Sequence, residues 1–174
     1  MTPEIASGPF LTAGMCGTSA GPFTPASLTE YLHQHIPLMA AMGLRAEIVD
    51  WQEIRLMTPI AGNLNHNRTA FGGSLASALT MAGWSMAHNR LRSCGFYAEQ
   101  PQTQLVVSRS ETRYLRPTNE DFTVSCRFAD DRAWDHFLEC LTRKGRGKLR
   151  LDAWAGDEGD PLCRFKASYV AIAD

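Results

Sequence analysis

The chain has 174 residues, of which 44% are hydrophobic and 20% charged, and this composition suits one globular domain and excludes a disordered chain. Its formal net charge is -1, so overall charge gives no reason to expect nucleic acid or a membrane surface as a partner. Five cysteines without a Cys-x-x-Cys pair argue against a disulfide framework or a zinc site and favour reduced thiols.

The first 26 residues are rich in Gly, Pro, Ser, Thr and Ala, and Glu4 is their one charged residue. They predict a flexible extension over residues 1–26, followed by one folded domain over residues 27–174. The N-terminus lacks the charged segment and apolar run of a secretory signal. No apolar run approaches the roughly 18 residues of a membrane span. We therefore expect a cytoplasmic protein.

The first helix signals lie at Thr24 and Ser27, either of which could cap a helix. Glu30 stands at the capping-box spacing from Ser27. Apolar residues then recur at helical spacing up to Met42, and Gly43 is expected to end this single helix.

Residues 44–51 and 54–60 alternate between apolar and polar positions and predict two strands. A polar loop over residues 61–69 follows. Residues 75–91 carry no charge before Arg90, and a helix that is apolar nearly all round is a buried helix.

The second half of the chain is rich in strand patterns, interrupted by a short helix predicted over residues 131–143. Strands are predicted over residues 104–115, 122–128, 149–155 and 163–172. A lone buried helix followed by a series of strands favours an α+β fold, in which a curved antiparallel sheet wraps around a long central helix.

Gly72 and Gly73 stand where the polar loop turns into the buried helix. The first N–H groups of a helix have no partner within the helix and carry the positive end of its dipole. Glycine there lets a ligand approach the backbone closely, so the pair suits an oxyanion or a thioester carbonyl. The alternative is a tight turn packed against a neighbouring strand.

The stretch from Asn65 to Leu75 resembles the loop and helix start of hotdog-fold thioesterases of the phenylacetyl-CoA type. Those proteins have an Asn, five further residues, His-Gly-Gly, and an acid seven residues after the second Gly. Asn65, Gly72 and Gly73 match this pattern. Phe71 replaces the His, and Thr80 stands at the position of the acid.

The chain is more similar to the thioesterase domain that is fused behind an acetyltransferase domain in some bacterial proteins. The similarity covers residues 27–172. It rests on Asn65-His66, Thr69-Ala70-Phe71-Gly72-Gly73-Ser74-Leu75 and Gly83-Trp84, with support from Ile36-Pro37 and Tyr114-Leu115-Arg116-Pro117.

This resemblance implies the hotdog fold and a thioesterase, a hydrolase that acts on acyl-CoA or on an acyl-carrier protein. It implies a homodimer or homotetramer, because hotdog proteins build the site where two subunits meet. CoA or phosphopantetheine would belong to the substrate, with no separate cofactor. No cluster of residues has metal-ligand spacing, so we predict no metal.

The catalytic candidates are Asn65, His66, Gly73 and Thr80. No Asp or Glu lies between Glu53 and Glu99, so the central helix offers no carboxylate. The resemblance gives Asn65 the role of orienting a water or the carbonyl, with help from Thr80. His66 is the best general base, although a loop histidine bonded to the backbone is an equal alternative.

The substrate-contact candidates are Phe71, Gly72, Ser74, Ser77 and Arg68. Each has a structural alternative. Phe71 could belong to the core, a helical serine commonly bonds its own backbone, and Arg68 could be an unpaired surface charge rather than a contact to CoA phosphate.

Thioester hydrolysis is the leading interpretation. The alternative is a non-catalytic module that binds acyl-CoA or an acyl-carrier protein, which the missing carboxylate favours. A hydratase ranks last, because the usual pair of His and acid is not visible. Entry of Glu99, Glu111 or Asp121 from a partner chain into the site would favour the enzyme.

Overall fold

The computed structural model describes residues 21–173, so most of the predicted extension lies outside the described range. Its elements are α1 (Pro25–His35), α2 (Pro37–Ala41), β1 (Arg45–Val49), β2 (Glu53–Thr58), α3 (Gly72–Ser93), α4 (Phe96–Glu99), β3 (Gln104–Tyr114), β4 (Phe122–Arg127), α5 (Asp131–Lys144), β5 (Arg146–Asp157) and β6 (Asp160–Ile172).

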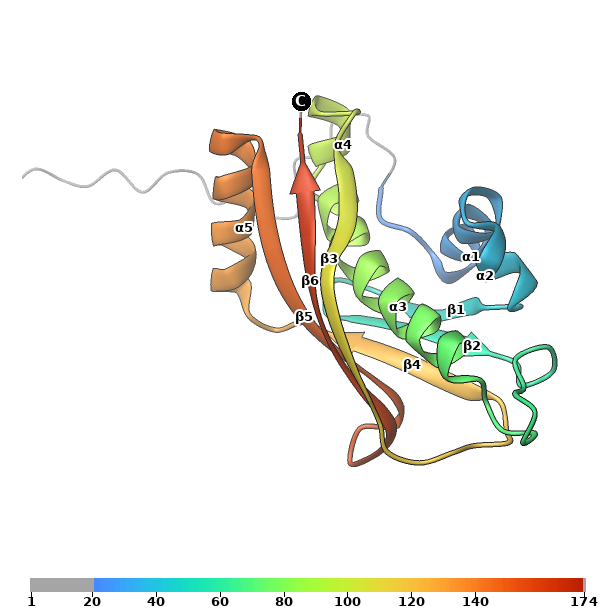
Figure 1. The fold of residues 1–174 in the computed structure, drawn as a ribbon. Helices are drawn as coiled ribbons and strands as arrows, with labels where there is room; N and C mark the ends of the chain where they lie inside the picture. Colours follow the sequence, from blue (N-terminus) through green and yellow to red (C-terminus); the bar gives the residue numbers. More distant parts are fainter. Residues whose placement is uncertain (1–20, 174) are drawn as a thin grey trace, which may run out of the picture.

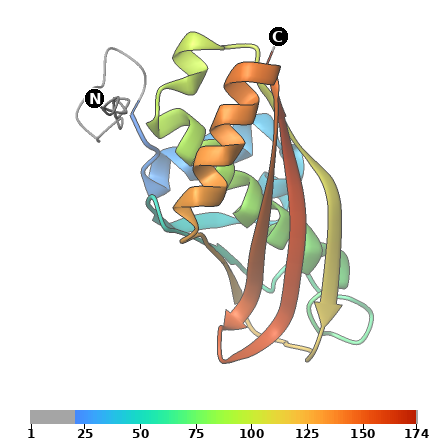
Figure 2. The ribbon, with the colours of Figure 1, turned by 90° about the vertical axis from the view of Figure 1, so that its left-hand side faces the viewer.

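The six strands form one antiparallel sheet in the order β1-β2-β4-β5-β6-β3. The sheet curves around α3, while α1 and α2 lie on one side of this helix and α5 on the other (Figure 1). α5 packs against β5 (Figure 2). The predicted arrangement of a curved antiparallel sheet around a long central helix is confirmed. In the described part of the chain, no helix is long and apolar enough to cross a membrane.

The central helix α3 is buried along the face that lies on the sheet. Leu75, Ala78, Leu79, Ala82 and Met86 are each at most 4% exposed. The helix approaches β6 so closely at Gly83 that a Cβ there would overlap the ring of Tyr169. The Tyr169 hydroxyl also donates a hydrogen bond of 2.8 Å to the Thr80 carbonyl. The predicted buried helix is therefore confirmed.

The prediction of one leading helix up to Met42 is wrong, because the segment breaks into α1 and α2 at Ile36. Pro37 lacks an N–H and disfavours helical dihedrals in the residue before it. Ile36 accordingly has φ -131° and ψ 88°. Thr24 is the cap, and its capping-box partner is Ser27 rather than Glu30.

The edge strand β3 contains an irregularity at Ser108. Val107 pairs with Tyr169, but Arg109, rather than Ser108, pairs with Ser168. One inserted residue exchanges the two faces of the strand that follows it. Arg109 and Glu111 therefore lie on the outer face of the sheet, and Tyr114 reaches the start of α3 on the inner face.

Arg90, near the end of α3, is fully buried. Its guanidinium carbon lies 4.1 Å from the ring centroid of Trp51, 4.6 Å from that of Phe128 and 5.3 Å from that of Trp134. Nε donates to the Trp51 carbonyl at 2.8 Å and Nη2 to the Phe128 carbonyl at 3.3 Å. Nη1 lies 3.8 Å from Asp131. This side chain therefore joins α3 to the β1–β2 turn, the end of β4 and α5.

Replacing Arg90 by lysine should lower the free energy of unfolding by about 3 kcal/mol, because an ammonium cannot stack flat on the rings and donate to both carbonyls. Urea unfolding measures the change, with the exposed Arg132→Lys as the control. A loss equal to that of the control would contradict the proposed role of Arg90.

His88 lies one turn along α3 from Trp84 in a second buried cluster. Its ring stacks on Trp84 with centroids 4.4 Å apart, and Nδ1 lies 2.7 Å from the Tyr97 hydroxyl. Burial, and secondarily the nearby Arg92 and His35, lower the pKa of His88 from 6.5 to about 4. The folded protein therefore holds this imidazole neutral.

Because the pKa of His88 is lower in the folded chain than in the unfolded chain, its contribution to stability is complete above pH 6.5 and falls as the pH drops towards 4. The two pKa values correspond to about 3 kcal/mol. Urea unfolding at pH 7 and pH 4.5 should show this loss in the wild type and in the exposed control His136→Gln. His88→Gln should lack it, and an unchanged pH dependence in that variant would sink the prediction.

Candidate active site at the start of the central helix

The first turn of α3 has no side-chain cap. Thr24 caps α1, and Asp130 caps α5 by accepting the Ala133 N–H at 3.1 Å. The N-cap of α3 is Phe71, which makes no side-chain cap hydrogen bond. The N–H groups of Gly72 and Gly73, at the positive end of a 22-residue helix, therefore remain available to an acceptor from outside the helix.

Two exposed aromatic rings flank these glycines. Phe71 is 54% exposed, and its ring occupies the space that a Cβ on Gly73 would need. Tyr114 is 55% exposed and donates a hydrogen bond of 2.9 Å to the Gly72 carbonyl. A Cβ on Gly72 would lie 3.4 Å from the Tyr114 ring. The missing Cβ of Gly73 therefore makes room for the Phe71 ring, whereas Gly72 packs against Tyr114 of the neighbouring strand at ordinary contact distance.

Gly73, Ser77 and Thr80 follow one another at helical spacing on one face of α3, which brings these predicted residues together. Ser77 and Thr80 are half-buried, as is Ser74 in the first turn. The Thr80 hydroxyl donates to the Ala76 carbonyl at 2.8 Å, so its oxygen keeps only acceptor capacity for a water. Trp84 closes the face one turn further on, with Nε1 bonded to the Leu105 carbonyl.

The Asn65 side chain shapes the loop before the helix. Its Oδ1 accepts the N–H groups of Asn67 at 2.9 Å and Thr69 at 3.2 Å, and Nδ2 donates to the Thr69 hydroxyl at 2.9 Å. One amide hydrogen remains for a ligand or a water. Asn65 can therefore donate a hydrogen bond without any rearrangement of the loop.

Asn63 anchors the same loop, a role that the sequence did not distinguish from those of its neighbours. Only 2% of it is exposed, and Nδ2 donates to the carbonyls of Met42 at 2.9 Å and Pro59 at 2.8 Å. Its backbone carbonyl accepts the Phe71 N–H at 2.7 Å. Asn63 thus fixes the residue at which α3 begins.

His66 is exposed and hydrogen-bonds no other residue within 21–173, so no group in this range orients its ring. Two of the candidate carboxylates of the second half, Glu111 and Asp121, have partners within the chain. Glu111 pairs with Arg113 on the outer face of the sheet, and Asp121 accepts the Ile60 N–H at 2.8 Å. Within the described residues, no group of three His, Cys, Asp or Glu is placed to hold a metal ion.

Arg68 borders an open hollow of about 580 Å³ beside the loop, between Leu64 and the segment that carries Pro117 and Thr118. Its φ of 60° is left-handed, and it is the one residue other than glycine with positive φ among residues 21–173. An L-residue is strained in this conformation, which glycine adopts freely. An arginine at this position suggests that its side chain has a role.

Known proteins share this sequence pattern and fold. Residues 25–173 match the family described as "Putative thioesterase (yiiD_Cterm)". A protein of unknown function from Chlorobaculum tepidum matches with a TM-score of 0.78 and 25% identity, over 87% of this chain and 98% of that one.

Two further solved structures are similar. A putative thioesterase from Shewanella oneidensis has a TM-score of 0.71 and 24% identity, over 85% of this chain and 96% of that one. A protein from Pseudomonas aeruginosa, described as a probable thioesterase, has a TM-score of 0.70 and 24% identity, over 88% of this chain and 99% of that one. The predicted hotdog fold is confirmed.

Arg68→Gly should raise the free energy of unfolding by about 1 kcal/mol relative to Arg68→Ala, because glycine relieves the left-handed strain and alanine keeps it. Urea unfolding of the two variants measures the difference. Equal stabilities would mean that residue 68 does not hold a left-handed backbone in solution.

Proposed function

The chain belongs to the "Putative thioesterase (yiiD_Cterm)" family, whose general chemistry is thioester hydrolysis, and we propose that it hydrolyses acyl thioesters of CoA or of an acyl-carrier protein at a site between two subunits. The observation that carries this proposal is the uncapped first turn of α3. A thioester carbonyl placed there receives the N–H groups of Gly72 and Gly73, and the helix dipole stabilises the oxyanion that forms.

A water then adds to the carbonyl carbon, and the carbon–sulfur bond breaks to release the thiolate. The remaining amide hydrogen of Asn65 holds the carbonyl or the water in line, and the free lone pairs of the Thr80 hydroxyl accept from the water. His66 takes the proton of the attacking water and returns it to the leaving thiolate. Reorientation of its exposed ring by the bound substrate is part of this proposal.

The substrate-contact residues divide by position. Phe71, Gly72, Ser74 and Ser77 line the first turns of α3, where the acyl group lies along the half-buried face that ends at Trp84. Arg68 stands at the hollow beside the loop and contacts a phosphate of the carrier group, which gives a reason for its strained backbone.

A second subunit completes this site by pairing along β3. This strand of 11 residues forms one edge of the sheet, and among residues 21–173 it pairs only with β6. Val106 is 46% exposed and Val107 is 42% exposed, and an unpaired edge of this kind is a template for another strand. Tyr114 at the end of β3 touches Gly72, so pairing along this edge brings the second subunit next to the helix start. We propose a homodimer, or a tetramer made of two such dimers.

The cysteines agree with a cytoplasmic enzyme. Cys94, Cys126, Cys140 and Cys163 are all free thiols. Reduced thiols are the usual state of cysteine in the cytosol.

A non-catalytic acyl-thioester binding module is the second candidate. The observation that favours it is that two proposed catalytic groups already form hydrogen bonds with the backbone. The Asn65 carbonyl oxygen and the Thr80 hydroxyl hydrogen are both bonded to the backbone, and the described part of α3 carries no carboxylate. Such a site could hold a thioester without splitting it.

Gly73→Ala should lower kcat at least about a hundredfold, because the new Cβ displaces the Phe71 ring at the amides that bind the oxyanion. The measurement is thiol release from a panel of acyl-CoA thioesters of different chain lengths. Gly159→Ala is the matched control, because a Cβ there meets nothing within 4 Å, and it should keep the wild-type rate. Asn65→Ala and His66→Ala, assayed alongside, should each reduce the rate.

Saturable binding without thiol release by the wild type would support the binding module and contradict hydrolysis of acyl-CoA. Equal activity of Gly73→Ala and Gly159→Ala would remove the helix start from the mechanism. Light scattering on the same samples should give a dimer or a tetramer, and an active monomer would contradict the shared site.

A further inference from the structure

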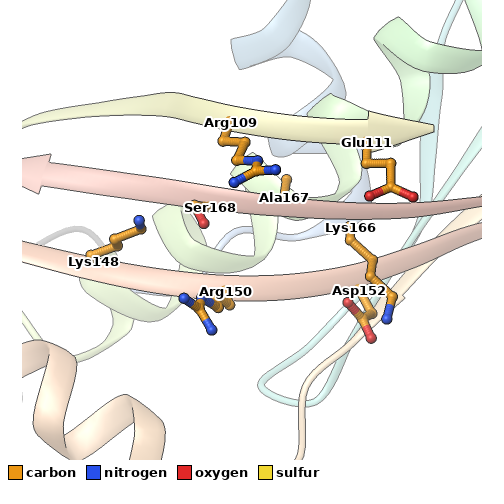
Figure 3. A pocket seen from close by; sticks show the side chains of 8 residues that line it. All are labelled: Arg109, Glu111, Lys148, Arg150, Asp152, Lys166, Ala167 and Ser168. Carbon is orange, nitrogen blue, oxygen red and sulfur yellow. The ribbon is translucent and has the colours of Figure 1, made fainter.

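The outer face of the sheet carries a charged hollow of about 360 Å³, on the side of the sheet away from α3. It lies over β5, β6 and β3, and its side chains divide into two groups. Arg109, Lys148 and Arg150 lie around Ser168 at one end, whereas Glu111, Lys166 and Asp152 lie at the other (Figure 3).

Strand register places the cations around Ser168. Arg150 of β5 and Arg109 of β3 both pair with Ser168 of β6, so two guanidinium groups flank one small hydroxyl residue. Lys148 lies two residues before Arg150 and therefore on the same face of β5. Within residues 21–173, no carboxylate forms an ion pair with Arg109, Lys148 or Arg150.

The neighbouring row of the sheet has a different charge pattern. In the strand register, Asp152 of β5 and Glu111 of β3 both lie opposite Lys166 of β6, so two acids flank this single cation. Glu111 also bonds Arg113 at 2.9 Å. The two acids of the hollow therefore lie beside Lys166, and the three cations around Ser168 keep an unbalanced positive charge.

The irregularity at Ser108 is what brings Arg109 into this group. In an uninterrupted β3, Ser108 would pair with Ser168, and Arg109 would face the helix side of the sheet. The Ser108 hydroxyl bonds the Ser168 carbonyl at 3.1 Å, so it holds the irregularity next to the hollow.

Clustered like charges repel one another and destabilise the fold unless an anion neutralises them. Two guanidinium groups and an ammonium around a small polar residue offer the planar forks and the point charge that phosphate oxygens accept. We propose that this hollow binds a phosphoanion, namely the phosphate or diphosphate group of a soluble nucleotide or of a lipid headgroup.

The acids at the other end of the hollow limit the size of this ligand. The Glu111 side chain is 55% exposed and would repel a broad acidic surface laid across all three strands. A compact phosphate or diphosphate can contact Arg109, Lys148 and Arg150 without reaching Glu111 or Asp152. These acids therefore favour a small phosphoanion over an acidic protein.

Isothermal titration calorimetry with inorganic pyrophosphate at low ionic strength tests the proposal. The wild type should bind one pyrophosphate per chain saturably, and Arg109→Gln and Arg150→Gln should each raise Kd at least about tenfold. Arg132→Gln, an exposed change of equal charge on α5, should leave Kd unchanged. Arg68→Gln, beside the other hollow, reports any pyrophosphate that binds near the start of α3 instead.

Titration with ADP, and flotation with phosphatidylcholine vesicles that contain phosphatidic acid, distinguish a soluble ligand from a lipid headgroup. The absence of saturable pyrophosphate binding would overturn the proposal, as would equal weakening by Arg132→Gln. Loss of binding in Arg68→Gln alone would place the anion at the helix start instead. Light scattering that shows fewer subunits in Arg109→Gln or Arg150→Gln, without pyrophosphate binding by the wild type, would make this face an interface between copies of the chain.

Discussion

The enclosure of α3 by the sheet is the constraint on which the other features depend. A helix without charge from Gly72 to His88 must be covered on most sides, and the sheet curves because it covers such a cylinder. The two ends of the helix are treated differently. The end that carries Arg90 and His88 is fixed by aromatic rings from five other segments. The end that begins at Gly72 is left open, and it can stay open because the anchoring at His88 and Arg90 lies about four to five helical turns away.

Sequence patterns predicted the elements whose signal is local. The long uncharged run gave α3, alternation gave the strands, and the glycine pair marked the open helix start. The break at Pro37 was readable in principle, because proline acts on the residue before it. The irregularity at Ser108 could not be predicted from the sequence, because strand register depends on a partner strand some 60 residues away. Tyr114 was missed as a site residue for the same reason, since its partner lies 42 positions earlier.

The loop before α3 shows why residue type alone predicts a role incompletely. Asn63 and Asn65 are two positions apart and have the same side chain, yet one is buried beneath the loop and the other closes a turn within it. What separates them is the backbone carbonyls of Met42 and Pro59, which only the folded chain brings near Asn63. The residue type decides which hydrogen bonds a side chain can form. The neighbouring groups in the fold decide how many of its lone pairs and hydrogens remain free for a ligand.

The exposed edge strand β3 has a consequence for the newly made chain. A long, unpaired strand can recruit any other extended segment, and this is a common route to aggregation during synthesis. β3 carries Arg109, Glu111 and Arg113 on one face and an inserted residue at Ser108. Both features oppose pairing of this edge with an unrelated strand. These charges and the inserted residue therefore lower the risk that the new chain aggregates through this edge.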